Sequence, residues 1–199
     1  MQASSSDRSK LRKTLIARRE ALPDALRMQH TAAIHAALRP LLEGLAVSRV
    51  GFCWPYRGEV DLRPALLAWL AAAPRRLLAL PVVPDQVGAL EFRHWFSDTP
   101  LASDRFGIPA PIGTPRVEPE LLLVPVNGFD ARGYRLGYGG GFFDRTLAAL
   151  QPAPITVGVG FELSRLTQVD AQAHDRPLDW ILTEDGCQPC QREDGGIAP

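Results

Sequence analysis

Short apolar runs alternate with amphipathic segments along the chain, and this alternation predicts an α/β fold. Apolar runs of strand length stand at residues 49–54, 77–82, 121–126, 155–161 and 180–182. Amphipathic stretches of helical length stand at residues 8–21, 24–44, 61–73 and 142–150. Because helices and buried strands take turns, we expect a mainly parallel sheet, with residues 90–96 as an antiparallel edge strand.

A cluster of glycines follows the apolar run at residues 121–126. The cluster consists of Gly133, Gly137, Gly139, Gly140 and Gly141. Glycine tolerates positive φ and lets backbone N–H groups approach an anion closely. The helix predicted at residues 142–150 would point its N-terminus at the same anion. We therefore interpret this stretch as a phosphate site.

Charged side chains flank the glycine cluster. Arg135 and Arg145 would add positive charge to a phosphate site, and Asp130 and Asp144 could offer carboxylate oxygens to Mg²⁺. Neither common nucleotide-binding pattern is present: the chain has no GxxxxGK followed by Ser or Thr, and Phe142 stands where GxGxxG needs its third glycine. From the residues alone, a glycine-rich surface loop or hinge stays an alternative.

The length, charge and terminal segments of the chain limit its domain organisation, its partners and its location. The 199 residues suffice for one domain with its own core. We expect residues 1–7 to be disordered, residues 8–186 to form a single α/β domain, and residues 187–199 to be a mobile tail. Basic and acidic side chains number 22 each, so the overall charge of a nucleic-acid binder is missing. With neither a membrane-spanning run nor a secretory signal in view, we expect a cytoplasmic protein with no membrane or nucleic-acid partner, as a monomer or weak dimer.

The order of residues in the glycine stretch points to a more specific function. Residues 128–145 read Gly-Phe-Asp-x-x-Gly-x-Arg-Leu-Gly-Tyr-Gly-Gly-Gly-Phe-Phe-Asp-Arg, which closely resembles the signature of the 5-formyltetrahydrofolate cyclo-ligase family, also called 5,10-methenyltetrahydrofolate synthetase. Weaker resemblance continues at the N-terminus, around Glu59 and over residues 174–184, in the family's order. The resemblance implies a three-layer α/β/α fold akin to sugar-phosphate isomerases, with N-terminal helices.

The resemblance also implies a reaction. It is the ATP- and Mg²⁺-dependent cyclisation of 5-formyltetrahydrofolate to 5,10-methenyltetrahydrofolate, which releases ADP and phosphate and passes through a phosphorylated formyl group, an iminium phosphate. Phosphoryl transfer asks a protein mainly for positioning and charge neutralisation. The absence of a Ser-His-Asp or Cys-His signal in this chain agrees with that.

Family motifs assign the ATP site residue by residue. In the basic N-terminal helix, Arg8 and Arg12 match two phosphate-binding positions, although the family usually shows Lys at the first of them. Arg135 and Asp144 fall on catalytic positions. The remaining ATP-binding positions implied are Leu136, Gly137, Tyr138, Gly139, Gly140, Gly141, Phe142 and Phe143.

The same resemblance assigns the folate and the metal. Glu59 falls on a residue that hydrogen-bonds the pterin ring, and the positions implied to line the pocket with it are Trp54, Tyr138 and Phe142. Asp144 and Asp175 fall on metal-binding positions, so Mg²⁺ is the implied cofactor and the partners are reduced folate and ATP. His174 could orient Asp175.

This chain departs from the family pattern in several places. Ala110 replaces a glutamate, and Phe142 and Phe143 stand where many members have two tyrosines. The segment at residues 126–128, Val-Asn-Gly, differs from the usual Gly-Val-Ala, which we interpret as a local packing change. Cys187 and Cys190 form a Cys-x-x-Cys in the predicted tail, and we interpret this pair as fortuitous rather than as a metal or redox site.

Two other functions stay open at this point. One is a folate- or nucleotide-binding regulatory protein with the same fold and weakened catalysis. The other is an α/β domain whose basic N-terminal helix binds RNA, although the stacking aromatics of single-stranded RNA sites are missing from that helix.

Overall fold

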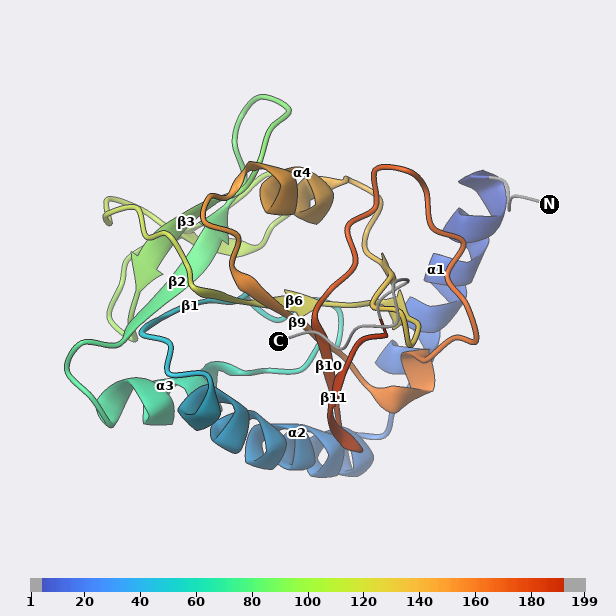
Figure 1. The fold of residues 1–199 in the computed structure, drawn as a ribbon, viewed down its shortest axis with the longest axis horizontal. Coiled ribbons are helices and arrows are strands. Elements are labelled where there is room, and N and C mark those ends of the chain that lie inside the picture. The colour runs from blue at the N-terminus through green and yellow to red at the C-terminus, as the bar shows by residue number, and fades with distance from the viewer. Residues whose placement is uncertain (1–4, 192–199) are drawn as a thin grey trace.

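A seven-stranded sheet forms the centre of the molecule (Figure 1). The computed structural model describes residues 5–191. The strand order is β11-β10-β9-β6-β1-β2-β3. These strands are β1 (Arg49–Gly51), β2 (Leu77–Val82), β3 (Glu91–Trp95), β6 (Leu121–Pro125), β9 (Ile155–Val159), β10 (Trp180–Thr183) and β11 (Gly186–Pro189). All inner pairs are parallel, and the outermost pairs, β2 with β3 and β10 with β11, are antiparallel.

Helices cover both faces of the sheet. The helices are α1 (Ser5–Glu20), α2 (Asp24–Gly44), α3 (Arg63–Ala71) and α4 (Phe142–Ala149), with a short 3-10 helix, η1 (Glu162–Ser164). Figure 1 shows α2 and α3 on one face and α4 on the other, while α1 stands at the side. The expected three-layer α/β/α fold with a mostly parallel sheet is therefore confirmed, as is the antiparallel edge strand β3.

Alternation along the strands creates two separate apolar cores. In β6, Leu121 and Leu123 pack with the side chains of α2 and α3, whereas Leu122 and Val124 pack on the opposite face with residues of α4. Side chains alternate across a strand, so a strand covered on both faces must be apolar at every position. This explains why residues 121–124 are all apolar and all buried.

The direction of the chain reverses between β1 and β6. From β1 the chain moves through α3 to β2 on one side, and from β6 it moves through α4 to β9 on the other side. The loops that leave the carboxyl ends of these two neighbouring strands therefore diverge, and open α/β sheets bind ligands in the crevice between such loops. Residues 52–62 follow β1, and residues 126–141 follow β6.

Both predicted disordered ends are partly ordered in the structure. Helix α1 begins at Ser5, inside the segment expected to be disordered. Residues 186–189, at the start of the expected tail, form β11, which pairs with β10. The side chain of Cys190 is buried, and burial raises the pKa of its thiol to about 12. The expected ends at residues 1–4 and 192–199 lie outside the described residues.

Two small hairpins complete the fold. Strands β4 (Leu101–Ser103) and β5 (Pro109–Pro111) form one, and β7 (Gly128–Phe129) and β8 (Arg135–Leu136) form the other. The second hairpin delivers the glycine cluster to the start of α4. None of the helices in residues 5–191 combines the length and apolarity needed to span a membrane.

We predict that the core under α2 carries much of the stability. Leu38 is fully buried there, so Leu38→Ala removes apolar contacts and leaves a cavity. The expected loss in the free energy of unfolding is about 3–5 kcal/mol. Met28→Ala, at an exposed position of the same helix, is the control and should change it by less than about 0.5 kcal/mol. An equal loss of unfolding free energy for Leu38→Ala and Met28→Ala in urea titrations would contradict this assignment of the core.

Candidate active site

The glycine loop runs over residues 137–141 and is held by arginines on two sides. Gly139 and Gly141 have φ of 93° and 63°, which other residues rarely adopt. Nε of Arg12, from α1, donates to the carbonyl of Gly137 at 2.5 Å. Nη2 of Arg145, from α4, donates to the carbonyl of Gly140 at 2.7 Å. These hydrogen bonds fix the course of the loop. Arg145 thus binds the backbone of the loop, rather than standing free to bind a phosphate.

Arg135 and Asp144 form a nearly buried ion pair beside this loop. Nη2 of Arg135 lies 2.9 Å from Oδ1 of Asp144, and Nη1 donates to the carbonyl of Arg176 at 2.6 Å. The backbone N–H of Arg176 donates to the same carboxylate oxygen at 3.1 Å. Burial lowers the pKa of Arg135, and the charges of Asp144 and Asp175 oppose that shift. The two predicted catalytic residues are thus brought together.

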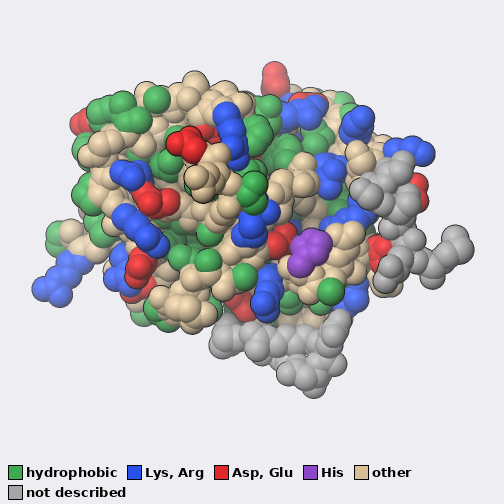
Figure 2. Space-filling model, turned by 90° about the horizontal axis from the view of Figure 1, so that it is seen from above, with side chains coloured by type: hydrophobic (Ala, Val, Ile, Leu, Met, Phe, Trp, Pro, Cys, Tyr) green, Lys and Arg blue, Asp and Glu red, His purple; other side chains and the backbone are tan. Residues whose placement is uncertain are grey.

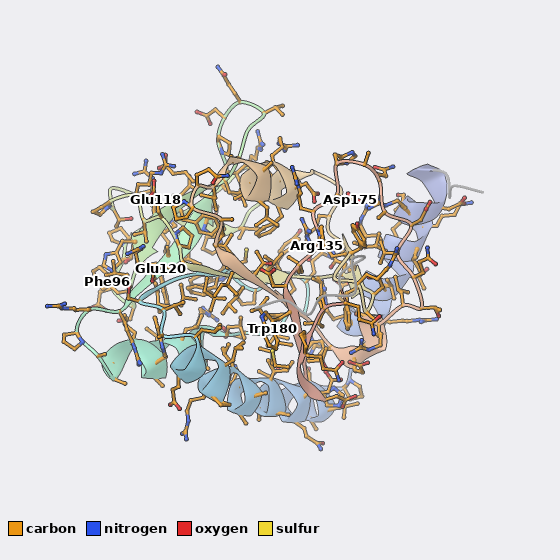
Figure 3. All side chains as sticks on the ribbon, viewed as in Figure 1. Phe96, Glu118, Glu120, Arg135, Asp175 and Trp180 are labelled. Atoms are coloured by element: carbon orange, nitrogen blue, oxygen red, sulfur yellow. The ribbon has the colours of Figure 1, made fainter. Side chains whose placement is uncertain are left out.

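Arg8 and Asp175 form a second pair close by. Nη1 of Arg8 lies 3.0 Å from Oδ2 of Asp175, which joins α1 to the loop before β10. Figure 3 shows Arg135 and Asp175 in the region between α4 and α1, on the side of the sheet away from α2. His174 is exposed, and its Nε2 lies 3.7 Å from Oδ1 of Asp175, which is too long for a hydrogen bond. Arg8, rather than His174, therefore orients Asp175.

Glu59 and Tyr138 meet across the divergence of the two loops. The hydroxyl of Tyr138, in the glycine loop, donates to Oε1 of Glu59 at 2.7 Å. The backbone N–H of Tyr56 donates to Oε2 of Glu59 at 3.0 Å. Burial raises the pKa of Glu59, while the charge of Arg19 and these hydrogen bonds oppose the shift. Burial also raises the pKa of Tyr138, with the charge of Glu59 acting in the same direction.

Two features lie beside Glu59: a small cavity on one side and, on the open side, a pair of tyrosine rings. A cavity of about 20 Å³, lined in part by Cys53, Glu59 and Pro125, has room for about one water molecule. On the open side, the rings of Tyr56 and Tyr138 lie 5.7 Å apart and are both exposed. A flat ligand that reached Glu59 would therefore meet these two rings rather than the cavity.

Trp54 does not join the predicted folate residues directly. Its ring contacts Trp95 edge-on at 6.3 Å, and the guanidinium of Arg63 covers it at 4.2 Å. Trp54 also packs against the core under α2, and none of its aromatic or cation–π contacts within residues 5–191 is with Glu59 or Tyr138. The order of residues after β1 placed Trp54 in the same loop as Glu59, but it could not show which way each side chain turns.

Phe142 lies in an aromatic and basic patch at the start of α4. Phe106, from the β4–β5 hairpin, contacts it edge-on at 5.9 Å and is 49% exposed. The guanidinium groups of Arg105 and Arg145 lie 5.7 Å and 5.2 Å from the ring of Phe142. Sequence reasoning did not select Phe106 or Arg105, although both lie within a few residues of Ala110, which replaces the family's glutamate. Phe142 and Phe143 both pack against the core under α4.

Arg19 and Asn127 are further site residues that sequence reasoning missed. Arg19 lies in the basic N-terminal helix, where only Arg8 and Arg12 were assigned a role, and it is only 2% exposed. Nη2 of Arg19 donates to the hydroxyl of Tyr138 at 2.9 Å, and Nη1 donates to Oδ1 of Asn127 at 2.7 Å. The available signals were the spacing of seven residues from Arg12, which puts Arg19 on the same face, and the unusual Asn127 itself.

Two expectations about single residues were wrong. Asp130 does not offer its oxygens to a cation, because it is buried and accepts hydrogen bonds from Arg132, Tyr134 and Val169. It therefore shapes the turn before β8. Asn127 is more than a packing change, because it hydrogen-bonds Arg19. Ala110, which replaces the family's glutamate, is buried in β5.

The pair of predicted metal ligands fits a magnesium ion held mainly by substrate. Oδ2 of Asp144 has no hydrogen-bond partner among the described residues, whereas Oδ1 is fully engaged. Asp175 contacts Arg8 through Oδ2, which leaves its Oδ1 available to a ligand. No group of three or more potential metal ligands occurs in residues 5–191. Mg²⁺ is commonly bound by one or two carboxylates together with phosphates and waters, so this donor set suits it.

Charged side chains of both signs surround these pairs. Figure 2, which views the molecule from the side of α4, shows Lys and Arg side chains interspersed with Asp and Glu across that face. The positive charge of the site is therefore local. It comes from Arg8, Arg12 and Arg135 rather than from a broad basic surface.

Comparison with known proteins gives consistent matches over most of the chain. The model of the 5-formyltetrahydrofolate cyclo-ligase family matches residues 4–184. A protein of that name from Mycolicibacterium smegmatis is 31% identical over 185 residues, covering 88% of this chain and 93% of that protein. Its namesake from Haemophilus influenzae is 30% identical over 150 residues, covering 71% and 79%.

Solved structures agree with these matches. The structure of 5,10-methenyltetrahydrofolate synthetase from Aquifex aeolicus superimposes with a TM-score of 0.78 at 29% identity, covering 92% of each chain. The synthetase from Mycoplasma pneumoniae gives a TM-score of 0.74 at 21% identity, covering 89% of this chain and 99% of that one, and supports the fold alone. The resemblance found in the sequence is therefore confirmed.

We predict that Asp130 acts on stability through the turn before β8. Asp130→Ala leaves the buried N–H of Val169 and the partly buried N–H groups of Arg132 and Tyr134 without an acceptor, so the free energy of unfolding should fall by about 3 kcal/mol. Asp24→Ala, at a fully exposed position, is the matched control and should cost less than about 0.5 kcal/mol. A loss below about 1 kcal/mol for Asp130→Ala in denaturant titrations would show that this turn does not depend on the carboxylate.

Proposed function

Because the chain belongs to the 5-formyltetrahydrofolate cyclo-ligase family, we propose that it cyclises 5-formyltetrahydrofolate to 5,10-methenyltetrahydrofolate with ATP and Mg²⁺. One observation carries the proposal for this chain: Arg135 and Asp144 form a nearly buried ion pair beside the glycine loop, with Arg8 and Asp175 paired nearby. Such a set offers cations to phosphate oxygens and carboxylates to a metal. Reduced folate and ATP are the proposed partners.

The proposed reaction proceeds in two steps. The formyl oxygen first attacks the γ-phosphorus of ATP; the bond to the β,γ-bridging oxygen breaks, and ADP leaves. The N10 amine then attacks the former formyl carbon, the bond from that carbon to the phosphorylated oxygen breaks, and phosphate departs together with the N10 proton. A formyl oxygen is a poor leaving group, and a phosphate is a good one. Phosphorylation therefore makes the ring closure possible.

The arginines supply the charge that phosphoryl transfer needs. Arg135 is held in place by the carbonyl of Arg176 and by Asp144, so its guanidinium costs little reorganisation when a phosphate arrives. Arg12 already lies along the glycine loop, with its guanidinium 3.2 Å from the position of a Cβ on Gly139. A Cβ at residue 139 would crowd this guanidinium, and the φ of 93° there would strain any residue other than glycine, so both features favour glycine at this position.

The carboxylates would hold the metal. Asp144 and Asp175 would bind Mg²⁺ through the oxygens that their arginine partners leave open. A bound Mg²⁺ would neutralise charge on the transferred phosphoryl group. Asp144 has a second part in this proposal, because its Oδ1 keeps Arg135 in position.

Glu59 and the neighbouring tyrosines would bind the pterin. An ionised carboxylate accepts hydrogen bonds through two oxygens with about four lone-pair sites, and Tyr138 and Tyr56 use only part of that capacity. Ring N–H groups of a pterin are donors that would use the rest. The exposed rings of Tyr56 and Tyr138 offer an aromatic surface beside the same carboxylate.

We predict that purified protein forms ADP and the methenyl chromophore only when 5-formyltetrahydrofolate, ATP and Mg²⁺ are all present. Arg135→Ala should lower kcat at least about 100-fold, because a preorganised cation for the phosphoryl group is lost. Asp144→Asn should lower it by a similar factor and raise the Mg²⁺ concentration needed for half-maximal rate. The absorbance of the methenyl product and a coupled assay for ADP measure the two products.

Controls separate the proposed function from its alternative. Arg18→Ala, at an exposed position of α1, should keep the wild-type rate. Binding of folate with neither product formed, in the complete mixture, would contradict the ligase and favour a folate-binding regulatory protein. Chromophore formation without Mg²⁺ would contradict the proposed Mg²⁺ dependence and the metal-binding role given to Asp144 and Asp175, but not the cyclisation itself.

We predict that Phe142 contributes its ring rather than a missing hydroxyl. Phe142→Tyr keeps the aromatic surface and should leave KM for the folate within about twofold, whereas Phe142→Ala should raise it about tenfold. Phe96→Ala is the control, since Phe96 is an exposed phenylalanine far from Arg135 and Asp175 (Figure 3). A rise in kcat of more than about tenfold for Phe142→Tyr would show instead that the site lacks a needed hydroxyl.

A further inference from the structure

One face of α1 carries arginines at spacings of four and seven residues. Arg8 pairs with Asp175, and Arg12 donates to the glycine loop. Arg19, two turns further along, is the most buried of the three at 2% exposure. Its neighbour Arg18 is exposed. A guanidinium is expensive to bury unless its donors and its charge are compensated, so the surroundings of Arg19 indicate what it does.

The donors of Arg19 reach three different segments. Nε donates to the carbonyl of Arg57 at 3.0 Å, Nη1 donates to Asn127 at 2.7 Å, and Nη2 donates to the hydroxyl of Tyr138 at 2.9 Å. That hydroxyl in turn donates to Oε1 of Glu59 at 2.7 Å, and Nη2 itself lies 3.8 Å from the same oxygen. Arg19, Tyr138 and Glu59 therefore form a relay in which each hydrogen bond polarises the next.

Asn127 anchors the relay from the far side. It is 1% exposed, and its Oδ1 must face Arg19 because a guanidinium only donates. Its Nδ2 then finds no hydrogen-bond partner among the described residues. A buried unpaired donor lowers stability, so packing does not account for an asparagine at this position. The contact with Arg19 does.

We propose that Arg19, anchored by Asn127, is a positioning residue for folate recognition, because it holds the Tyr138 hydroxyl and the Glu59 carboxylate in one geometry beside the glycine loop. This inference rests on the proposed function, in which Glu59 binds the pterin. Arg19 acts through Tyr138 and Glu59 and needs no contact with substrate. The carbonyl of Arg57 accepts a hydrogen bond from Arg19, and Arg57 belongs to the same loop as Glu59. Arg19 therefore also fixes the backbone of the loop that carries Glu59.

The effect of Arg19 should fall on the folate more than on ATP. The glycine loop has independent supports in Arg12 and Arg145, which bind the carbonyls of Gly137 and Gly140. Loss of Arg19 leaves these contacts and the pair between Arg135 and Asp144 in place. Glu59, in contrast, has Arg19 as its compensating cation.

The experiment compares Arg19→Met, Arg19→Lys and Asn127→Val with the control Arg18→Met, all in the full chain. We expect Arg19→Met to raise KM for 5-formyltetrahydrofolate about tenfold or more, since it removes charge-assisted hydrogen bonds. Arg19→Lys should recover part of this, and Asn127→Val should raise KM about threefold. KM for ATP should stay within about twofold throughout, and Arg18→Met should match wild type.

The pH dependence supplies a second readout that a purely structural role would not move. The groups facing Glu59 are Arg19 from α1, Tyr138 from the glycine loop, Tyr56 from its own loop and Cys53 after β1. Burial raises the pKa of both Tyr138 and Cys53, so each stays neutral near neutral pH. Arg19 opposes the effect of burial on Glu59; without it the pKa of Glu59 rises further, and the ionised form requires a higher pH.

Arg19→Met should therefore recover folate affinity as the pH is raised from about 6 to about 9, more than wild type or Arg18→Met does. The inference is overturned if a folded Arg19→Met has a folate KM within about twofold of Arg18→Met, or if KM for ATP rises equally. If Arg19→Met does not fold, judged by circular dichroism, an unchanged folate KM in both Arg19→Lys and Asn127→Val overturns it. Absence of the methenyl product from wild type would instead reject the proposed function.

Discussion

The reversal of chain direction between β1 and β6 is the constraint on which the site depends. The two strands are parallel neighbours, so their carboxyl ends lie together, but α3 and α4 carry the chain to opposite faces of the sheet. The loop with Glu59 and the loop with the glycines must then leave the sheet side by side and separate. A hydrogen bond between Tyr138 and Glu59 closes the gap that this separation creates.

Helix α1 joins the two halves of the site because one of its faces is basic. Its apolar contact with the rest of the fold is narrow, with Leu15 packed beside Leu136 and Val169. The polar contacts of Arg8, Arg12 and Arg19 reach much further, from the loop before β10 to the loop after β1. Leu15 and Ile16 are both buried, so the helix is held by these apolar side chains and also where its arginines meet the segments that would bind substrate.

Much of the fold could be predicted from the sequence, because apolar periodicity directly reflects burial. The parallel strands, the edge strand β3 and the positions of α2 and α4 all follow from it. Strand β11 could not be found this way, since Gly186–Pro189 contains a single apolar position, Cys187, among small and polar residues, and takes its structure from pairing with β10. The proposed catalytic pair of Arg135 and Asp144 came from a family motif. Arg19 was missed and Asp130 was misjudged, because a charged residue's burial depends on partners distant in sequence.

The relay through Tyr138 explains why the most buried cation of the site does not pair directly with Glu59. A bidentate contact between Arg19 and Glu59 would engage both carboxylate oxygens and leave little capacity for a ligand. At 3.8 Å, with the Tyr138 hydroxyl bridging them, the guanidinium still compensates the charge of the carboxylate. Arg135 and Asp144, in contrast, are in direct contact at 2.9 Å. Direct contact suits this pair, because the proposed phosphate would bind the arginine and the proposed metal would bind the aspartate. The looser contact of Arg19 with Glu59 thus leaves carboxylate oxygens available for the proposed folate, while the tighter contact of Arg135 with Asp144 still leaves one carboxylate oxygen for a metal.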